Sequence, residues 1–129
     1  MKDRYLFKAK TCRGDWVQGF LASKNGKWYI GNEAGRPLAF EIRPETICQC
    51  TGLKDKNGEL IFENDIIERL DIHDIKGPSI GIIEYDVENT SFLIHWTDIA
   101  NYSPTFHWKN RIGVIGNIFD NAELLESEE

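Results

Sequence analysis

The sequence lacks the features that mark secreted, membrane and repeat proteins. Its 129 residues include three cysteines, an odd number that does not make a disulfide framework, so a cytoplasmic location is expected. No apolar run approaches the roughly 20 residues that a membrane helix needs. Lys8 also interrupts the first apolar stretch too early for the core of a signal peptide. Without repeats or linkers either, the chain is expected to be one soluble domain over residues 1–129, with no membrane partner.

Its composition is that of a globular protein with a real core, since 41% of the residues are hydrophobic and 12% aromatic. The formal net charge of −6 is unevenly distributed. Residues 1–50 hold nine Lys/Arg and five Asp/Glu, whereas residues 51–129 hold six and sixteen, which gives +4 and −10. Such asymmetry raises the question of a nucleic-acid partner or an acidic tail, but two oppositely charged halves that lie against one another explain it as well.

The first third of the chain has the pattern of a β-meander. Residues 16–22 and 28–30 are rich in residues that suit strands. Between them, Asn25-Gly26 is a strong two-residue hairpin signal, because both central positions of a type I′ turn need a positive φ. A third short strand over 38–42 ends before Pro44.

The remainder predicts further short strands and one helical turn. The only helical pattern is at 121–126. Strands separated by turn signals are typical of a small barrel or sandwich. A weak boundary near 44–50 would divide subdomains 1–48 and 49–129. The strands are expected at residues 59–62, 66–70, 80–85, 92–96, 105–108 and 112–115.

Two long motifs carry a family resemblance. Residues 49–67, which include Thr51-Gly52-Leu53 and Asn57-Gly58, and residues 114–125 resemble the hallmark segments of the YopX-like proteins of bacteriophages and prophages. Residues 81–85 correspond to a glycine-led strand of the same family. The chain departs from the family pattern at Asn64, usually glycine, and at Cys50, usually aromatic. Asparagine tolerates a positive φ, so the same turn is expected at Asn64.

What the resemblance implies is a fold and a setting rather than a reaction. The family's C-terminal part suggests an SH3-like β-barrel. The expected fold is therefore mainly β: an N-terminal β-meander, a small SH3-like β-barrel and a short C-terminal helical turn, with α+β as the alternative. The family supplies no enzymatic activity that could be assigned to particular residues here.

Metal binding and catalysis have little support in the residue pattern. Cys12, Cys48-Gln49-Cys50 and the three histidines lack the spacing of a structural zinc site. The Asp71-Ile72-His73-Asp74 segment joins carboxylates to an imidazole, but loop composition alone predicts it and no nucleophile elbow accompanies it. We expect neither an enzyme nor a cofactor.

The His95-Trp96 and His107-Trp108 pairs are the candidate interaction surface, together with Tyr102. If residues 101–104 formed the turn of a hairpin, His95 would lie opposite Trp108, and Trp96 opposite His107. Each face would then present an aromatic platform. In the alternative, the tryptophans pack in the core and the histidines flank it, because a shift of one residue reverses both faces.

A basic, aromatic-interleaved segment begins the chain. It is the candidate phosphate-binding patch, although the acidic remainder opposes nucleic acid at long range. The patch consists of Lys2, Arg4, Lys8, Lys10 and Arg13.

The leading hypothesis is therefore a non-enzymatic interaction or assembly module of phage origin. Its partner would be a second copy or a phage or host protein, reached through a strand edge or an aromatic patch. The positive half of one copy could meet the acidic half of another, head to tail. A nucleic-acid-associated protein is the alternative.

Overall fold

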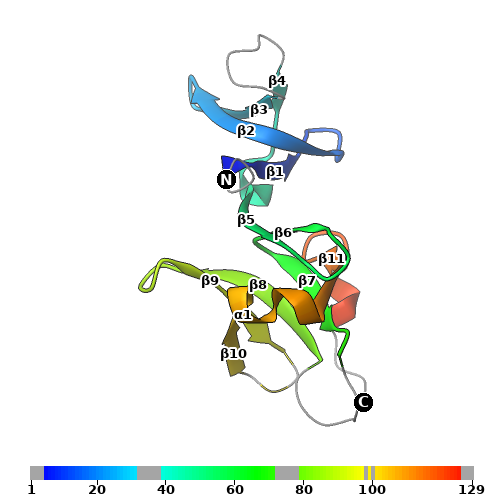
Figure 1. Ribbon diagram of the computed structural model, residues 1–129. Helices are drawn as coiled ribbons and strands as arrows, with labels where there is room; N and C mark the ends of the chain where they lie inside the picture. The colour runs from blue at the N-terminus through cyan, green and yellow to red at the C-terminus, as the bar shows by residue number, and fades with distance from the viewer. Residues whose placement is uncertain (1–4, 32–38, 72–78, 98, 100, 126–129) are drawn as a thin grey trace. The chain divides into compact units, whose positions relative to one another are not determined.

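β-Strands dominate the computed structural model of the chain, which describes residues 5–31, 39–71, 79–97, 99 and 101–125. The strands form two antiparallel sheets (Figure 1), which confirms the mainly β prediction. Within these residues the single α-helix is α1 (Thr105–Trp108), and no helix is long and apolar enough to cross a membrane. The chain divides into two units, Met1–Gly52 and Leu53–Glu129.

The first unit is the predicted β-meander. Its strands follow one another in the order β4-β3-β2-β1-β5. Asn25 (φ 55°) and Gly26 (φ 80°) form the tight turn that joins β2 to β3, as the Asn-Gly signal predicts. The strands are β1 (Phe7–Lys10), β2 (Trp16–Lys24), β3 (Lys27–Gly31), β4 (Ala39–Glu41) and the first part of β5 (Cys48–Lys54).

A small apolar core lies on one face of this meander. Ala9, Ile30 and Ile42 are buried, and Val17 and Leu21 pack against them. The neighbouring residues of each strand alternate to the opposite face, as the pleat requires. The core is small because the strands are short, and the 3₁₀-turn η2 (Pro44–Thr46) leads from it into β5.

The second unit contains the larger sheet, in the order β10-β9-β8-β7-β11. The short β6 precedes this sheet in the chain and lies next to β5 in the strand order. The strands are β6 (Leu60–Phe62), β7 (Asp65–Arg69), β8 (Ile80–Asp86), β9 (Ser91–Trp96), β10 (Asn101–Pro104) and β11 (Ile112–Asn117).

Two local predictions for this part are wrong. Residues 101–104 form strand β10 rather than a turn, and residues 105–108 form α1 rather than a strand. Residues 51–54 of the first motif continue β5, with Gly52 at φ 82°. The helical pattern at 121–126 gives a 3₁₀-turn, η4 (Ala122–Leu125). At 101–104 the pairing with β9, and at 105–108 the packing of Trp108 on the core, overrode local propensity.

Closure into the expected SH3-like barrel is not seen. Among the described residues β10 and β11 are the two ends of the sheet and do not pair with each other. The prediction of a mainly β fold with a short helical turn is confirmed. The α+β alternative also fits, because the sheet is open and carries a short helix.

The core of the second unit is built from isoleucines and one indole. Ile67, Ile83, Ile94 and Trp96 are fully buried, and Trp108 packs against them. Gly81 lies opposite Trp96 on β8, where a Cβ would come within 2.6 Å of Ile94 Cγ2 and 3.3 Å of Trp96 Cε3. The glycine-led strand therefore provides space for the indole.

The hallmark motif has a structural role. The carboxylate of Asp55 is buried and accepts hydrogen bonds from the backbone N–H groups of Asn57 (2.8 Å), Glu59 (2.9 Å) and Val114 (2.8 Å). It therefore links the turn of the first motif to the first residue of the second. Asn64 adopts φ 74°, which confirms the positive φ expected for the turn at this position.

Candidate interaction surface

Strand β9 separates a buried face from an exposed one. Ile94 and Trp96 point into the core, and the Trp96 Nε1–H donates to Ser103 Oγ (2.8 Å). Leu93 and His95, which alternate with them, lie on the outer face and are half-buried. This alternation decides which of the predicted residues can meet a partner.

The predicted pairing of the histidines and tryptophans is wrong. In the β9–β10 ladder His95 lies opposite Tyr102, and Trp96 lies opposite Asn101. Trp108 is in α1, and its ring packs edge-on against Trp96 with the centroids 5.1 Å apart. The indoles therefore form core contacts, as the alternative interpretation had it, and do not make a platform with the imidazoles.

Trp108 is covered on its outer side by cations. The Arg111 guanidinium lies 3.8 Å from its ring centroid and that of Arg69 lies 5.3 Å away. Asp71 receives a hydrogen bond from Arg69 Nε (3.0 Å) and lies 3.8 Å from Arg111. Partial burial acts to raise the pKa of Asp71, but the Arg69 hydrogen bond and the two positive charges outweigh it and hold this pKa below 3.8. These contacts hold the two arginines against Trp108, which packs against the core of this unit.

The outer face of β8–β10 carries a preorganised polar and aromatic group. The His95 ring stacks on Tyr102, with centroids 4.5 Å apart and an interplanar angle of 13°. His95 Nδ1 and Glu84 Oε2 are 2.9 Å apart. Tyr102 is 52% exposed although its ring is fixed by this stack. A rigid, accessible aromatic ring of this kind is a typical anchor for a protein partner.

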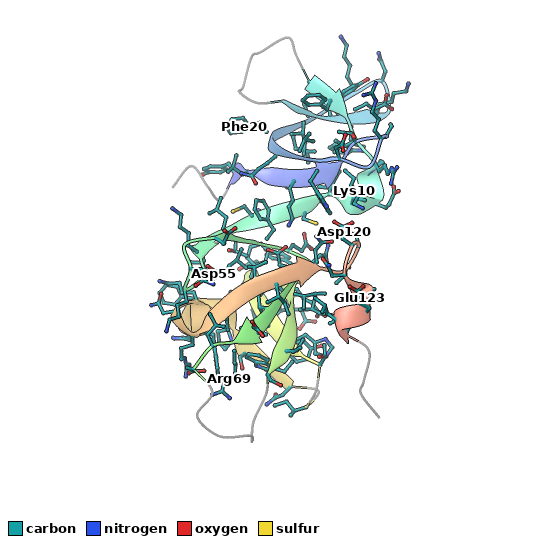
Figure 2. The ribbon with its side chains drawn as sticks, turned by 90° about the vertical axis from the view of Figure 1, so that its right-hand side faces the viewer. Lys10, Phe20, Asp55, Arg69, Asp120 and Glu123 are labelled. Carbon is teal, nitrogen blue, oxygen red and sulfur yellow. The ribbon has the colours of Figure 1, made fainter. Side chains whose placement is uncertain are left out.

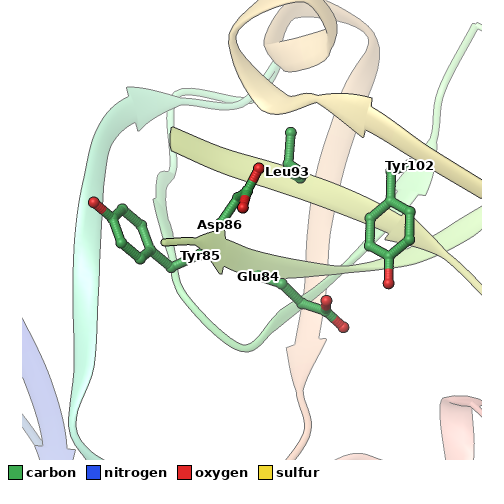
Figure 3. A pocket seen from close by; sticks show the side chains of 5 residues that line it. All are labelled: Glu84, Tyr85, Asp86, Leu93 and Tyr102. Carbon is green, nitrogen blue, oxygen red and sulfur yellow. The ribbon is translucent and has the colours of Figure 1, made fainter. Parts of the chain in front are cut away.

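A shallow pocket of about 320 Å³ lies beside this group (Figure 3). Its lining comes from three neighbouring strands, and Tyr85 points away from the other labelled side chains in Figure 3. Leu93 and Tyr102 supply apolar surface, while Glu84 and Asp86 supply two carboxylates. The pocket can therefore accept an apolar stem that ends in a cation.

The edge of β10 is poorly suited to take another strand. The Tyr102 N–H donates a hydrogen bond to Asn101 Oδ1 (2.8 Å). Pro104, two residues further along the strand, has no backbone N–H. These two positions lie on the same side of the strand, so that side lacks open donors. The outer face of the sheet is therefore the better contact surface than its edge.

His107, the last of the predicted surface residues, is on α1, whereas His95 and Tyr102 are on strands β9 and β10. It is exposed on α1, with its ring 5.6 Å from that of Phe106. Phe106 is itself 62% exposed and has the Lys109 ammonium 5.9 Å from its ring. The contacts of α1 give a second exposed aromatic position but do not join His107 to His95.

The predicted basic patch is only partly assembled. Lys2 and Arg4 fall outside the described residues. Lys8 and Lys10 share the face of Trp16, with their ammonium groups 5.1 and 5.6 Å from its ring. Lys10 lies on β1 and is labelled in Figure 2. Arg13 instead lines a pocket of about 660 Å³ together with Val17, which packs against the core of the first unit.

Two features of the surface were missed by sequence reasoning. Glu84 completes the His95 group. The register of the β8–β9 ladder brings the two side chains together, and no local sequence pattern predicts that register. Lys24 and Lys27 flank the Asn25-Gly26 turn and lie directly opposite each other, both exposed. The hairpin signal itself contained this information, because a two-residue turn fixes the pairing of its flanking residues.

The three cysteines, the three histidines and the Asp71-Ile72-His73-Asp74 segment carry the side chains suited to metal binding or acid–base chemistry. His73 and Asp74 of the acid–imidazole segment fall outside the described residues. In the described part of the chain, no three His, Cys, Asp or Glu side chains come together as a metal site. Cys48 and Cys50 are buried on the same face of β5, and Cys12 is exposed.

The family model described as YopX protein matches residues 5–126, nearly the whole chain. No curated protein matches the chain.

Proposed function

The chain belongs to the YopX protein family, and from that premise we propose that it is a non-enzymatic protein-interaction or assembly module of phage or prophage origin. The observation that carries the proposal is the Tyr102 ring, which is half-exposed and held in place by its stack on His95. An interface anchor is most effective when its side chain is ordered before binding, since less conformational entropy is then lost. The partner is a second copy or a phage or host protein in the bacterial cytoplasm.

The chemistry of the surrounding surface supports a protein partner. Leu93 and Tyr102 give apolar contact area, and Glu84 and Asp86 give directional acceptors at its border. An apolar centre with a polar rim is the usual composition of a protein interface. The acidic second half would repel a polyanion from this face.

The test compares three forms of the full chain immobilised as bait: the parent, Tyr102→Ala and Tyr5→Ala. Tyr5 is the matched control because it is 56% exposed but lies outside this surface. Bacterial host lysate is applied with and without nuclease, and bound proteins are identified by mass spectrometry. We expect a defined protein that survives nuclease treatment, is lost with Tyr102→Ala and persists with Tyr5→Ala.

The opposite pattern would count against the proposal. Binding that Tyr102→Ala leaves unchanged would remove this surface from the interface. A chain that neither retains a protein nor associates with itself in sedimentation velocity would not be an interaction module.

A second candidate function, association with nucleic acid, is favoured by one observation. The ammonium groups of Lys8 and Lys10 lie over the Trp16 ring, and cations beside an aromatic face are typical of single-strand binding surfaces. The expected result is a fluorescent oligonucleotide bound with an affinity that falls steeply with salt and is lost with Lys8→Ala/Lys10→Ala. Affinity unaffected by this double variant would exclude the patch.

A further inference from the structure

The β2–β3 hairpin ends in two lysines that repel each other. Lys24 and Lys27 are the last pair of the ladder before the Asn25-Gly26 turn, so their side chains leave the same face about 5 Å apart at Cβ. Both are exposed, and within the described residues neither has an acidic partner. Like charges directly opposite each other destabilise a hairpin unless an external anion neutralises them.

The pocket on β8–β10 has the complementary character. Glu84 and Asp86 are two residues apart on one face of β8, which separates them by roughly 7 Å along the strand. His95 holds Glu84, and the Asp86 carboxylate accepts from Glu88 N–H (3.2 Å) and Asn89 Nδ2–H (2.7 Å). Each carboxylate is therefore ordered yet keeps further acceptor capacity.

We propose that the Lys24/Lys27 tip of one copy docks into the Glu84/Asp86/Tyr102 pocket of a second copy, head to tail. The spacing of the two ammonium groups can match that of the two carboxylates. The lysine stems would lie on Leu93 and Tyr102, since such stems bury readily on apolar surface. Within each chain the basic and acidic halves provide the same complementarity at longer range.

This inference rests on the proposed function and deepens it by naming the partner as the chain itself. The contact is heterologous, because the surface given by one copy differs from the surface that receives it. Repetition of such a contact makes a closed ring if the rotation between neighbouring copies divides a full turn, and an open filament if it does not.

A charge exchange between two full-length variants tests it. Variant A carries Lys24→Glu/Lys27→Glu, and variant B carries Glu84→Lys/Asp86→Lys. Each variant alone places like charges at every contact, whereas in a mixture every contact between an A chain and a B chain pairs opposite charges. Sedimentation velocity of A, of B and of their equimolar mixture, at low and high salt, gives the readout.

We expect the parent chain to associate in a concentration-dependent and salt-sensitive manner. The dissociation constant should rise by about tenfold or more in A and in B and return toward the parent value in the mixture. The charge-matched controls are Lys54→Glu/Lys56→Glu and Glu59→Lys/Glu123→Lys, which change exposed residues elsewhere and should leave association unchanged. Glu84→Gln/Asp86→Asn serves as a milder version of B and should weaken association without disturbing the fold, checked by circular dichroism.

Several results would overturn the inference. A parent chain that stays monomeric at all concentrations refutes self-docking while leaving the lysate experiment to judge a different protein partner. A and B that associate as the parent does, or a mixture that fails to recover, refute this pairing of surfaces. An oligonucleotide bound by the parent and lost in A, with unchanged sedimentation, would assign the lysine pair to a phosphate backbone instead.

Discussion

Removal of the Asp55 carboxylate should destabilise the second unit more than any exposed charge change. In Asp55→Ala three backbone N–H groups, those of Asn57, Glu59 and Val114, lose their acceptor. Asp55 is only 5% exposed, so its place is not readily taken by bulk water. The substitution also separates the turn of residues 55–59 from strand β11.

The magnitude follows from the surroundings of each donor. A hydrogen bond to a charged acceptor contributes about 1.5–3 kcal/mol. Asn57 and Glu59 are exposed residues whose N–H groups can turn toward water, whereas Val114 is half-buried and its bond joins residues far apart in the chain. Counting the Val114 bond fully and the other two partly gives a loss of roughly 3–5 kcal/mol. This is a large share of the roughly 5–15 kcal/mol that stabilises a typical domain.

Chemical denaturation followed by circular dichroism and tryptophan fluorescence measures the loss, and hydrogen exchange locates it. Asp55→Asn keeps one carbonyl oxygen, so it should lose less than Asp55→Ala, about 1.5–3 kcal/mol. Asp15→Asn, which removes the same charge at an exposed position, should change stability by less than about 0.5 kcal/mol. The reasoning fails if Asp55→Ala behaves like Asp15→Asn, or if the Val114 amide exchanges as slowly in the variant as in the parent.

Three further predictions concern backbone space, a turn and acid stability. Gly81→Ala should cost about 1–3 kcal/mol in denaturation, because its Cβ would meet Ile94 at 2.6 Å; an unchanged midpoint would contradict the close packing. Asn64→Ala should be less stable than Asn64→Gly by about 1 kcal/mol, because only glycine adopts φ 74° without strain, and equal melting temperatures would argue against this cause. Asp71 has a lowered pKa in the folded protein, so its contribution to stability is present above the ordinary pKa of 3.8 and is lost as the pH falls through the folded pKa. Asp71→Asn should therefore flatten the decline in the free energy of unfolding between about pH 5 and pH 2. Parallel curves of stability against pH for the parent and the variant would refute this.

Much of the fold could be predicted because it depends on local signals. Asn25-Gly26 gave the β2–β3 turn since few residues tolerate two consecutive positive φ angles. The match of residues 5–126 to the YopX family confirmed the resemblance drawn from the two motifs. Residues 105–108 were less tractable, because Phe, His and Trp suit a strand as well as a short helix that packs Trp108 onto the core.

The candidate surface shows the same division. The sequence by itself identified the aromatic and imidazole residues, and the alternation of a strand separated Trp96 from His95. It could not supply their neighbours, because the register between β9 and β10 depends on pairing across the sheet and a shift of one residue reverses every face. Only the tertiary structure placed Tyr102 on His95 and Glu84 beside it, and only it brought the carboxylates of β8 into one pocket with Tyr102. Strand and turn identity are local properties of the chain, whereas the composition of a surface is decided by contacts between residues far apart in sequence.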